Sequence, residues 1–88
     1  MLTTAKVKIC EIIVNERIAT PINKDSIDFK NLFESIKKNG IMIPLRLSGK
    51  FQPFNNNIEF TLIDGLRRLE IAKDLGITEV PAFVEMSL

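Results

Sequence analysis

The chain has 88 residues, a hydrophobic fraction of 45% and a formal net charge of +1. This length predicts one domain over residues 1–88, with enough apolar residues to form a compact core. The chain has no histidine and a single cysteine, Cys10, which excludes histidine-based catalysis, an internal disulfide and a cysteine metal cluster. Because the net charge is small, any anion binding must depend on the local placement of charged residues.

No apolar run approaches the roughly 18 residues that span a membrane, and residues 1–6 lack the apolar region of a signal peptide. We therefore expect a cytoplasmic protein with no membrane partner. Residues 1–5 are expected to be a loose end. Residues 6–10 alternate polar and apolar side chains, which predicts a half-buried strand with Cys10 as a small buried side chain.

Residues 15–26 contain Pro21 and several Asn, Thr and Asp residues, which predicts a loop. So long a loop is unusual in a short domain, and long loops often serve binding. A helix is predicted over residues 28–39, because four apolar residues recur at i, i+3, i+4 and i+7: Phe29, Leu32, Phe33 and Ile36. Ser26 or Asp28 is expected to cap its start. Gly40 is expected at its end.

Alternation predicts strands over residues 43–47, 58–62 and 80–86. The first of these contains Pro44 and is therefore expected near a sheet edge. Residues 48–57 are predicted to be a turn-rich connection between two antiparallel strands. A second helix is predicted over residues 65–75. The pattern β, α, β, β, α, β indicates an α+β domain with a small mixed sheet and two main helices.

The second helix carries a charge on its apolar side. We place the helix on a wheel with 100° per residue and Leu66 at 0°. Arg68 then falls at about 200°, inside the apolar arc, and Arg67 falls at about 100°, on the border of that arc. A guanidinium on the core-facing side needs a partner. The partner is either a carboxylate, such as Asp64 or Glu59, or a bound anion near the free N–H groups of the first turn. Gly65 either lets such a ligand approach the backbone or serves only a turn with positive φ.

Two segments resemble a known family. Residues 64–84, beginning Asp-Gly-Leu-Arg-Arg-Leu-Glu and continuing to a Val-Pro strand, resemble the Gly-x-Arg-Arg box of ParB N-terminal domains. Residues 32–45, with a Ser-Ile pair, a glycine and Pro44, resemble the segment that precedes this box in the family. The superfamily also includes the sulfiredoxins, so the resemblance implies a ParB/sulfiredoxin-like fold over most of the chain.

The resemblance implies a nucleotide pocket. Gly65, Arg67 and Arg68 would hold phosphate oxygens, and Ser35 and Asn31 match polar positions on the first helix that face the nucleotide in relatives. Asp64 would either pair with an arginine or help to hold magnesium with the phosphates. The ligand implied is CTP or ATP with magnesium. No residue pattern predicts a metal site made by the protein alone, and no pair of carboxylates has the spacing of a two-metal nuclease.

Some positions depart from the family pattern. Leu66 stands where sulfiredoxins have their catalytic cysteine and where ParB proteins usually have glutamate, so the resemblance identifies no catalytic residue. The chain ends at Leu88 without a helix-turn-helix domain. We therefore expect a stand-alone ParB-like domain that binds a nucleotide or phosphate and acts as a DNA-associated partition accessory, with nucleotide, DNA and a second copy of the chain as partners. The alternatives are a weak nucleotidase or DNase, and a non-catalytic interaction module.

Overall fold

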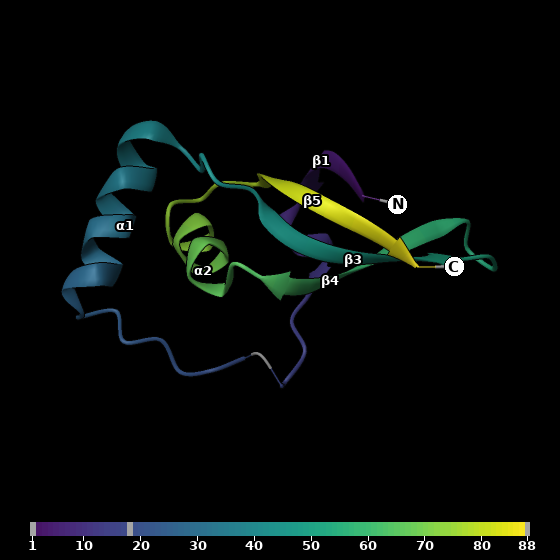
Figure 1. The fold of residues 1–88 in the computed structure, drawn as a ribbon, viewed down its shortest axis with the longest axis horizontal. Helices are drawn as coiled ribbons and strands as arrows, with labels where there is room; N and C mark the ends of the chain where they lie inside the picture. Colours follow the sequence, from purple (N-terminus) through teal and green to yellow (C-terminus); the bar gives the residue numbers. More distant parts are fainter. Residues whose placement is uncertain (1, 18, 88) are drawn as a thin grey trace.

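The computed structural model describes residues 2–17 and 19–87. It contains a five-stranded mixed sheet and two α-helices (Figure 1), which confirms the predicted α+β class. The elements in chain order are β1 (Leu2–Lys8), a 3-10 turn η1 (Ile9–Glu11), β2 (Ile12–Ile13), α1 (Ile27–Asn39), β3 (Leu45–Gln52), β4 (Asn57–Asp64), α2 (Leu66–Asp74) and β5 (Glu79–Ser87). Within these residues neither helix is long and apolar enough to cross a membrane.

The strands lie in the order β1–β5–β3–β4–β2. β1 pairs with β5 and β3 pairs with β4 in antiparallel fashion, whereas β3–β5 and β4–β2 are parallel pairs. The expectation that residues 43–47 form an edge strand is therefore wrong, because β3 is the central strand. Pro44 is tolerated because β3 begins only at Leu45, so the missing N–H of the proline falls outside the ladder.

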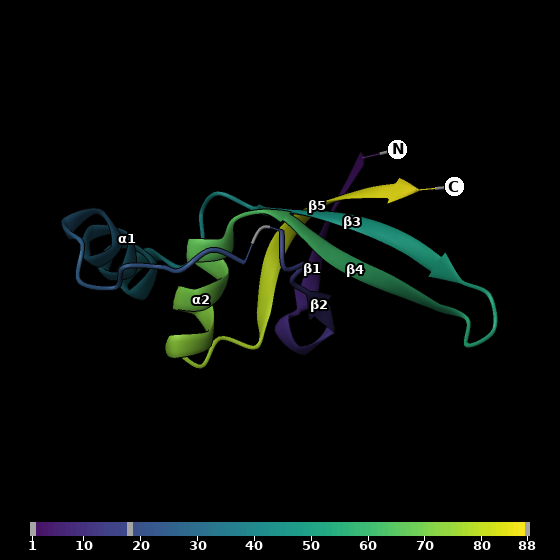
Figure 2. The ribbon, with the colours of Figure 1, turned by 90° about the horizontal axis from the view of Figure 1, so that it is seen from below.

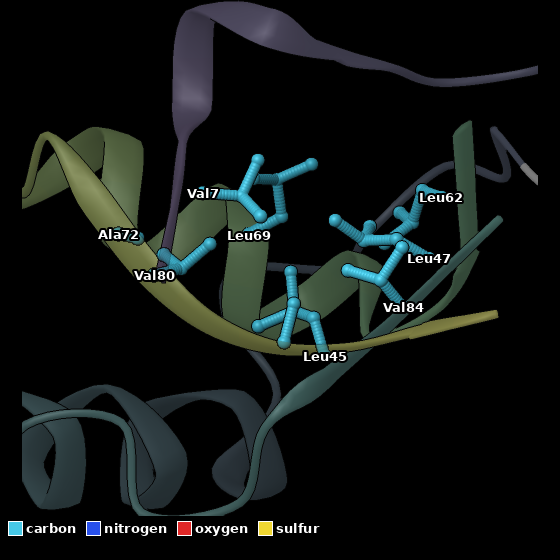
Figure 3. Packing of buried hydrophobic residues seen from close by; sticks show 9 residues of the cluster. Val7, Leu45, Leu47, Leu62, Leu69, Ala72, Val80 and Val84 are labelled. Atoms are coloured by element: carbon cyan, nitrogen blue, oxygen red, sulfur yellow. The ribbon is translucent and has the colours of Figure 1, made fainter. Parts of the chain in front are cut away.

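The two helices form successive layers on one side of the molecule. α2 lies against one face of the sheet, and α1 lies beyond α2, away from the strands (Figures 1 and 2). Figure 3 shows how Leu69 and Ala72 of α2 pack with Leu45, Leu47 and other sheet residues. On its other side α2 contributes Ile71 to a second cluster with Phe29 and Ile36 of α1. α2 is therefore buried between two layers, which explains its wide apolar arc.

The β3–β4 hairpin is longer than the sequence suggested. Residues 48–57 were expected to be a connection, but β3 continues to Gln52 and β4 starts at Asn57. The predicted antiparallel pairing of the two strands is confirmed. Gly49 interrupts the alternation of apolar and polar residues that would have predicted a strand here. A Cβ atom at this position would lie 2.6 Å from the Met86 Sδ. The glycine thus allows close packing inside a strand rather than marking a turn.

The N-terminal segment also differs from expectation. β1 begins at Leu2, where it pairs with β5, so residues 2–5 are part of the sheet rather than a loose end, while Met1 lies outside the described residues. Cys10 lies in η1 and is exposed, so the prediction of a small buried side chain is wrong, because the chain leaves the sheet before reaching it. Among the described residues, positions 14–26 contain no helix or strand, which agrees with the predicted loop.

Candidate functional site

A tight turn joins β4 to α2. Gly65, the N-cap residue of α2, has φ +110° and ψ 27°, a backbone conformation that favours glycine. A Cβ atom at this position would lie 2.9 Å from Cγ of Leu45, a core residue with no exposed surface. The Gly65 N–H donates to Asp64 Oδ1 at 2.9 Å. Both backbone conformation and close packing therefore require glycine at this turn.

The first turn of α2 has no side-chain cap. Its first backbone hydrogen bond runs from the Leu69 N–H to the Gly65 carbonyl at 2.9 Å, so the three preceding amide groups have no acceptor within the helix. No acidic residue lies in this first turn. α1 differs, because Ser26 Oγ accepts from the Phe29 N–H at 3.2 Å and Asp28 lies in its first turn. The α2 end is therefore the more favourable of the two for an anion.

A cavity of about 690 Å³ opens in front of this turn. Its lining comes from three segments: residues 20–23 of the long loop, the start of α1 from Ser26 to Leu32, and the β4–α2 turn from Leu62 to Arg68. Apolar side chains such as Phe29 and Leu66 lie beside polar ones such as Asn23 and Asp28. A cavity of this size falls within the range of small-molecule pockets, and its lining is more polar than apolar, which suits a charged ligand.

The two arginines of the turn both line the cavity, but their surroundings differ. The Arg67 side chain is exposed and has no hydrogen bond or ion pair with any residue that the structure describes. The Arg68 side chain is only 18% exposed. The helical wheel is confirmed in this respect, because it put Arg68 within the buried arc and Arg67 at its border. Arg67 is thus the guanidinium that is available to a ligand.

Arg68 has internal partners that the sequence did not suggest. Its Nη1 donates to the carbonyl oxygens of Ile43 at 2.7 Å and Pro44 at 3.0 Å. Its Nη2 lies 4.0 Å from Asp64 Oδ2, one of the two carboxylates considered from the sequence. The other, Glu59, instead accepts a hydrogen bond from Gln52 Nε2 at 3.2 Å. Since the Asp64 side chain is 69% exposed, this ion pair adds little to stability.

The remaining predicted residues are divided between the cavity and the surface. Gly65 and Asp64 line the cavity with the arginines, whereas Asn31 and Ser35 are exposed on α1 and are not among its lining residues. Sequence reasoning missed Asn23, Ser26 and Asp28 as lining residues. The length of the 15–26 loop was the available signal, because it pointed to binding without identifying which loop residues would face the ligand.

The family model and a similar solved structure both point to ParB N-terminal domains. The model of the ParB N-terminal domain family matches residues 2–87. A pNOB8-like ParB N-domain structure is similar with a TM-score of 0.75 and 25% identity, covering 99% of this chain and 30% of that chain. No curated protein gives a significant sequence match.

More distant structures share the fold. ParB from Caulobacter crescentus, complexed with CTP-gamma-S, has a TM-score of 0.72 and 21% identity over 98% of this chain and 46% of its own. Sulfiredoxin from Arabidopsis thaliana has a TM-score of 0.74 and 14% identity over 97% of this chain and 86% of its own. The chain thus spans less than half of each of the two ParB structures.

Proposed function

This chain belongs to the ParB N-terminal domain family, and we propose on that basis that it binds a nucleotide through its phosphate groups at the Gly65–Arg68 turn. One observation carries the proposal: the exposed, unpaired Arg67 guanidinium lies beside the uncapped start of α2 at a cavity. A phosphate there would accept hydrogen bonds from backbone amides and from Arg67, and its charge would offset the helix dipole. Gly65 supports the site through its positive φ, which forms the tight turn that places these amides at the cavity.

The rest of the cavity offers contacts for the sugar and the base. Asn23 and Asp28 lie on the loop and α1 sides of the cavity, and Phe29 supplies apolar surface. We assign no phosphate contact to Asn31 and Ser35, because they lie outside the cavity lining. They remain candidates only for a part of the ligand that extends along α1.

CTP is the first nucleotide to test, because a ParB relative was solved with CTP-gamma-S. ATP is the second, by resemblance to sulfiredoxins. Among the described residues there is no group of three or more His, Cys, Asp or Glu that would hold a metal ion. Magnesium would therefore be held chiefly by the phosphates, with Asp64 or Asp28 adding an oxygen ligand.

We further propose that the chain acts in the cytoplasm as a partition-related, DNA-associated accessory, in line with its family. The Caulobacter crescentus ParB was also solved complexed to its centromeric parS site. We propose that this DNA association involves a second copy of the chain or a partner protein. A weak nucleotidase or DNase activity is the enzymatic alternative.

A non-catalytic interaction module is the second candidate, and two observations favour it. Packing of Leu45 accounts for Gly65, and internal carbonyl groups account for Arg68. In this interpretation the turn serves folding alone. It leaves Arg67 unexplained, since its side chain contacts no charged partner among the described residues. Arg67 therefore discriminates between the two functions.

Titration calorimetry with CTP, ATP and inorganic phosphate, each with and without magnesium, tests the proposal. Wild type is compared with Arg67→Met and with Arg46→Met, which removes an exposed arginine outside the cavity lining. Loss of a charge-assisted contact predicts about a 10- to 100-fold higher Kd for Arg67→Met, with Arg46→Met unchanged. Equal affinity in Arg67→Met would refute the site. Absence of any binding, with no rise in Tm, would favour the interaction module.

Phosphate release from labelled nucleotide, and nicking of plasmid DNA with divalent metal, test the enzymatic alternative. An activity of this protein is expected to fall in Arg67→Met. An activity that persists unchanged in that variant would come from a contaminant.

A further inference from the structure

The neighbouring arginines of α2 offer different groups to a ligand. Arg67 is exposed and its guanidinium has no partner in the described chain, whereas Arg68 is mostly buried and contacts three other residues. We propose that the two have separate roles: Arg67 contacts the anion, and Arg68 is a positioning residue that fixes the α1–β3 connection against the turn. The role of Arg67 rests on the proposed function, whereas the role of Arg68 does not.

The Nη1 group of Arg68 donates hydrogen bonds to two neighbouring backbone carbonyl groups. Nη1 carries two N–H donors, and the two contacts, at 2.7 Å to Ile43 and 3.0 Å to Pro44, use both. These carbonyl oxygens lie 25 and 24 residues earlier in the chain, directly before the central strand. The guanidinium therefore joins the start of α2 to the start of β3. A planar guanidinium is suited to such a fixed geometry.

The same contact holds the turn itself. Leu45 follows the bound carbonyls and lies fully buried against Gly65, within 2.9 Å of where a Cβ atom would be. Nη2 of Arg68 lies 3.5 Å from that same point. Leu45 and Arg68 thus enclose Gly65, whose backbone sets the direction of the first amides of α2. Fixing the segment before Leu45 consequently fixes the direction in which Arg67 and these amides point.

A bound anion is expected to contact Arg67 rather than Arg68. If Arg68 moved to a ligand, the Ile43 and Pro44 carbonyls would lose their donor, and the Pro44 contact is partly buried. An acceptor that loses its partner away from water is costly. Arg67 makes no contact that a ligand would have to replace. A bound phosphate is therefore expected to recruit Arg67 and leave the Arg68 bridge in place.

Hydrogen exchange of the ligand-free protein tests the role of Arg68 directly. Arg68→Lys keeps the charge but lacks the planar group that reaches both carbonyls, and Arg67→Lys is its matched control. Amide exchange at residues 45–47 is expected to be at least about 10-fold faster in Arg68→Lys than in wild type. Arg67→Lys is expected to match wild type. Unchanged exchange in Arg68→Lys would overturn the positioning role.

Binding separates the two halves of the proposal. For inorganic phosphate and CTP, Arg67→Lys is expected to raise Kd without changing exchange at residues 45–47. Arg68→Lys is expected to change both, and a raised Kd with wild-type exchange would make Arg68 a direct ligand instead. If wild type binds neither these two probes nor ATP, the proposed function fails, while the exchange result still decides the role of Arg68.

Discussion

Replacing Gly65 with alanine tests the turn that organises the candidate site. Gly65 has φ +110°, and its added Cβ atom would lie 2.9 Å from Cγ of the fully buried Leu45. The left-handed backbone alone costs a non-glycine residue about 1–2 kcal/mol. Overpacking a core side chain adds about 1–3 kcal/mol. We therefore expect Gly65→Ala to lower the free energy of unfolding by about 2–5 kcal/mol, against a total of about 4–13 kcal/mol for 88 residues.

Two other glycines provide matched controls. Gly40 and Gly76 have φ +76° and +73°, and a Cβ atom at either would meet no atom within 4 Å. Alanine at these positions is expected to cost only the backbone share, about 1–2 kcal/mol. Urea unfolding monitored by circular dichroism gives all three values, provided that the m-value stays constant. If Gly65→Ala is no more destabilising than the two controls, the close packing of Leu45 against the turn is refuted.

Two further substitutions test the helix that forms the opposite side of the cavity. Ser26→Ala removes the acceptor of the Phe29 N–H and is expected to cost about 1 kcal/mol in urea unfolding; Ser35→Ala, exposed on the same helix, should stay within about 0.5 kcal/mol of wild type. Ile71→Ala truncates a fully buried side chain that packs between α1 and α2. It is expected to lower the free energy of unfolding by about 2–5 kcal/mol. A cost below about 1 kcal/mol for Ile71→Ala would mean that α1 does not pack as described.

The helices were predictable because local sequence determines them. α1 begins at Ile27, one residue before the prediction, and ends at Asn39 as predicted. Its periodic apolar residues meet α2, and Ser26 was one of the two caps named. α2 runs from Leu66, one residue after its predicted start. Periodicity and capping act within a few residues, so they are visible in the sequence.

The sheet was less predictable because distant residues set it. Gly49 reads locally as a turn residue, yet Met86 and Val84 of β5 pack against its bare backbone. The parallel pairing of β3 with β5 makes β3 central, and no local pattern marks such a long-range pair. Extension of β1 to Leu2 likewise depends on β5, to which it pairs.

The candidate site was predictable in its position but only partly in its contacts. Gly65 and Arg67 lie in a recognisable turn, and the helical wheel distinguished the mostly buried Arg68 from the exposed Arg67. The wheel did not identify what Arg68 would contact, because its main partners are backbone carbonyls of Ile43 and Pro44. Every residue carries a carbonyl group, so such partners leave no signal in the sequence.

The most direct test of the central claim is an NMR titration of the isotope-labelled chain with CTP, which follows each backbone amide. We predict saturable shifts that begin at the amides of residues 65–68 and include the cavity side of α1, with the same pattern weakened in Arg67→Met. Saturable shifts centred elsewhere, or shifts at residues 65–68 that are equally strong in Arg67→Met, would contradict the assignment of this turn as the phosphate site.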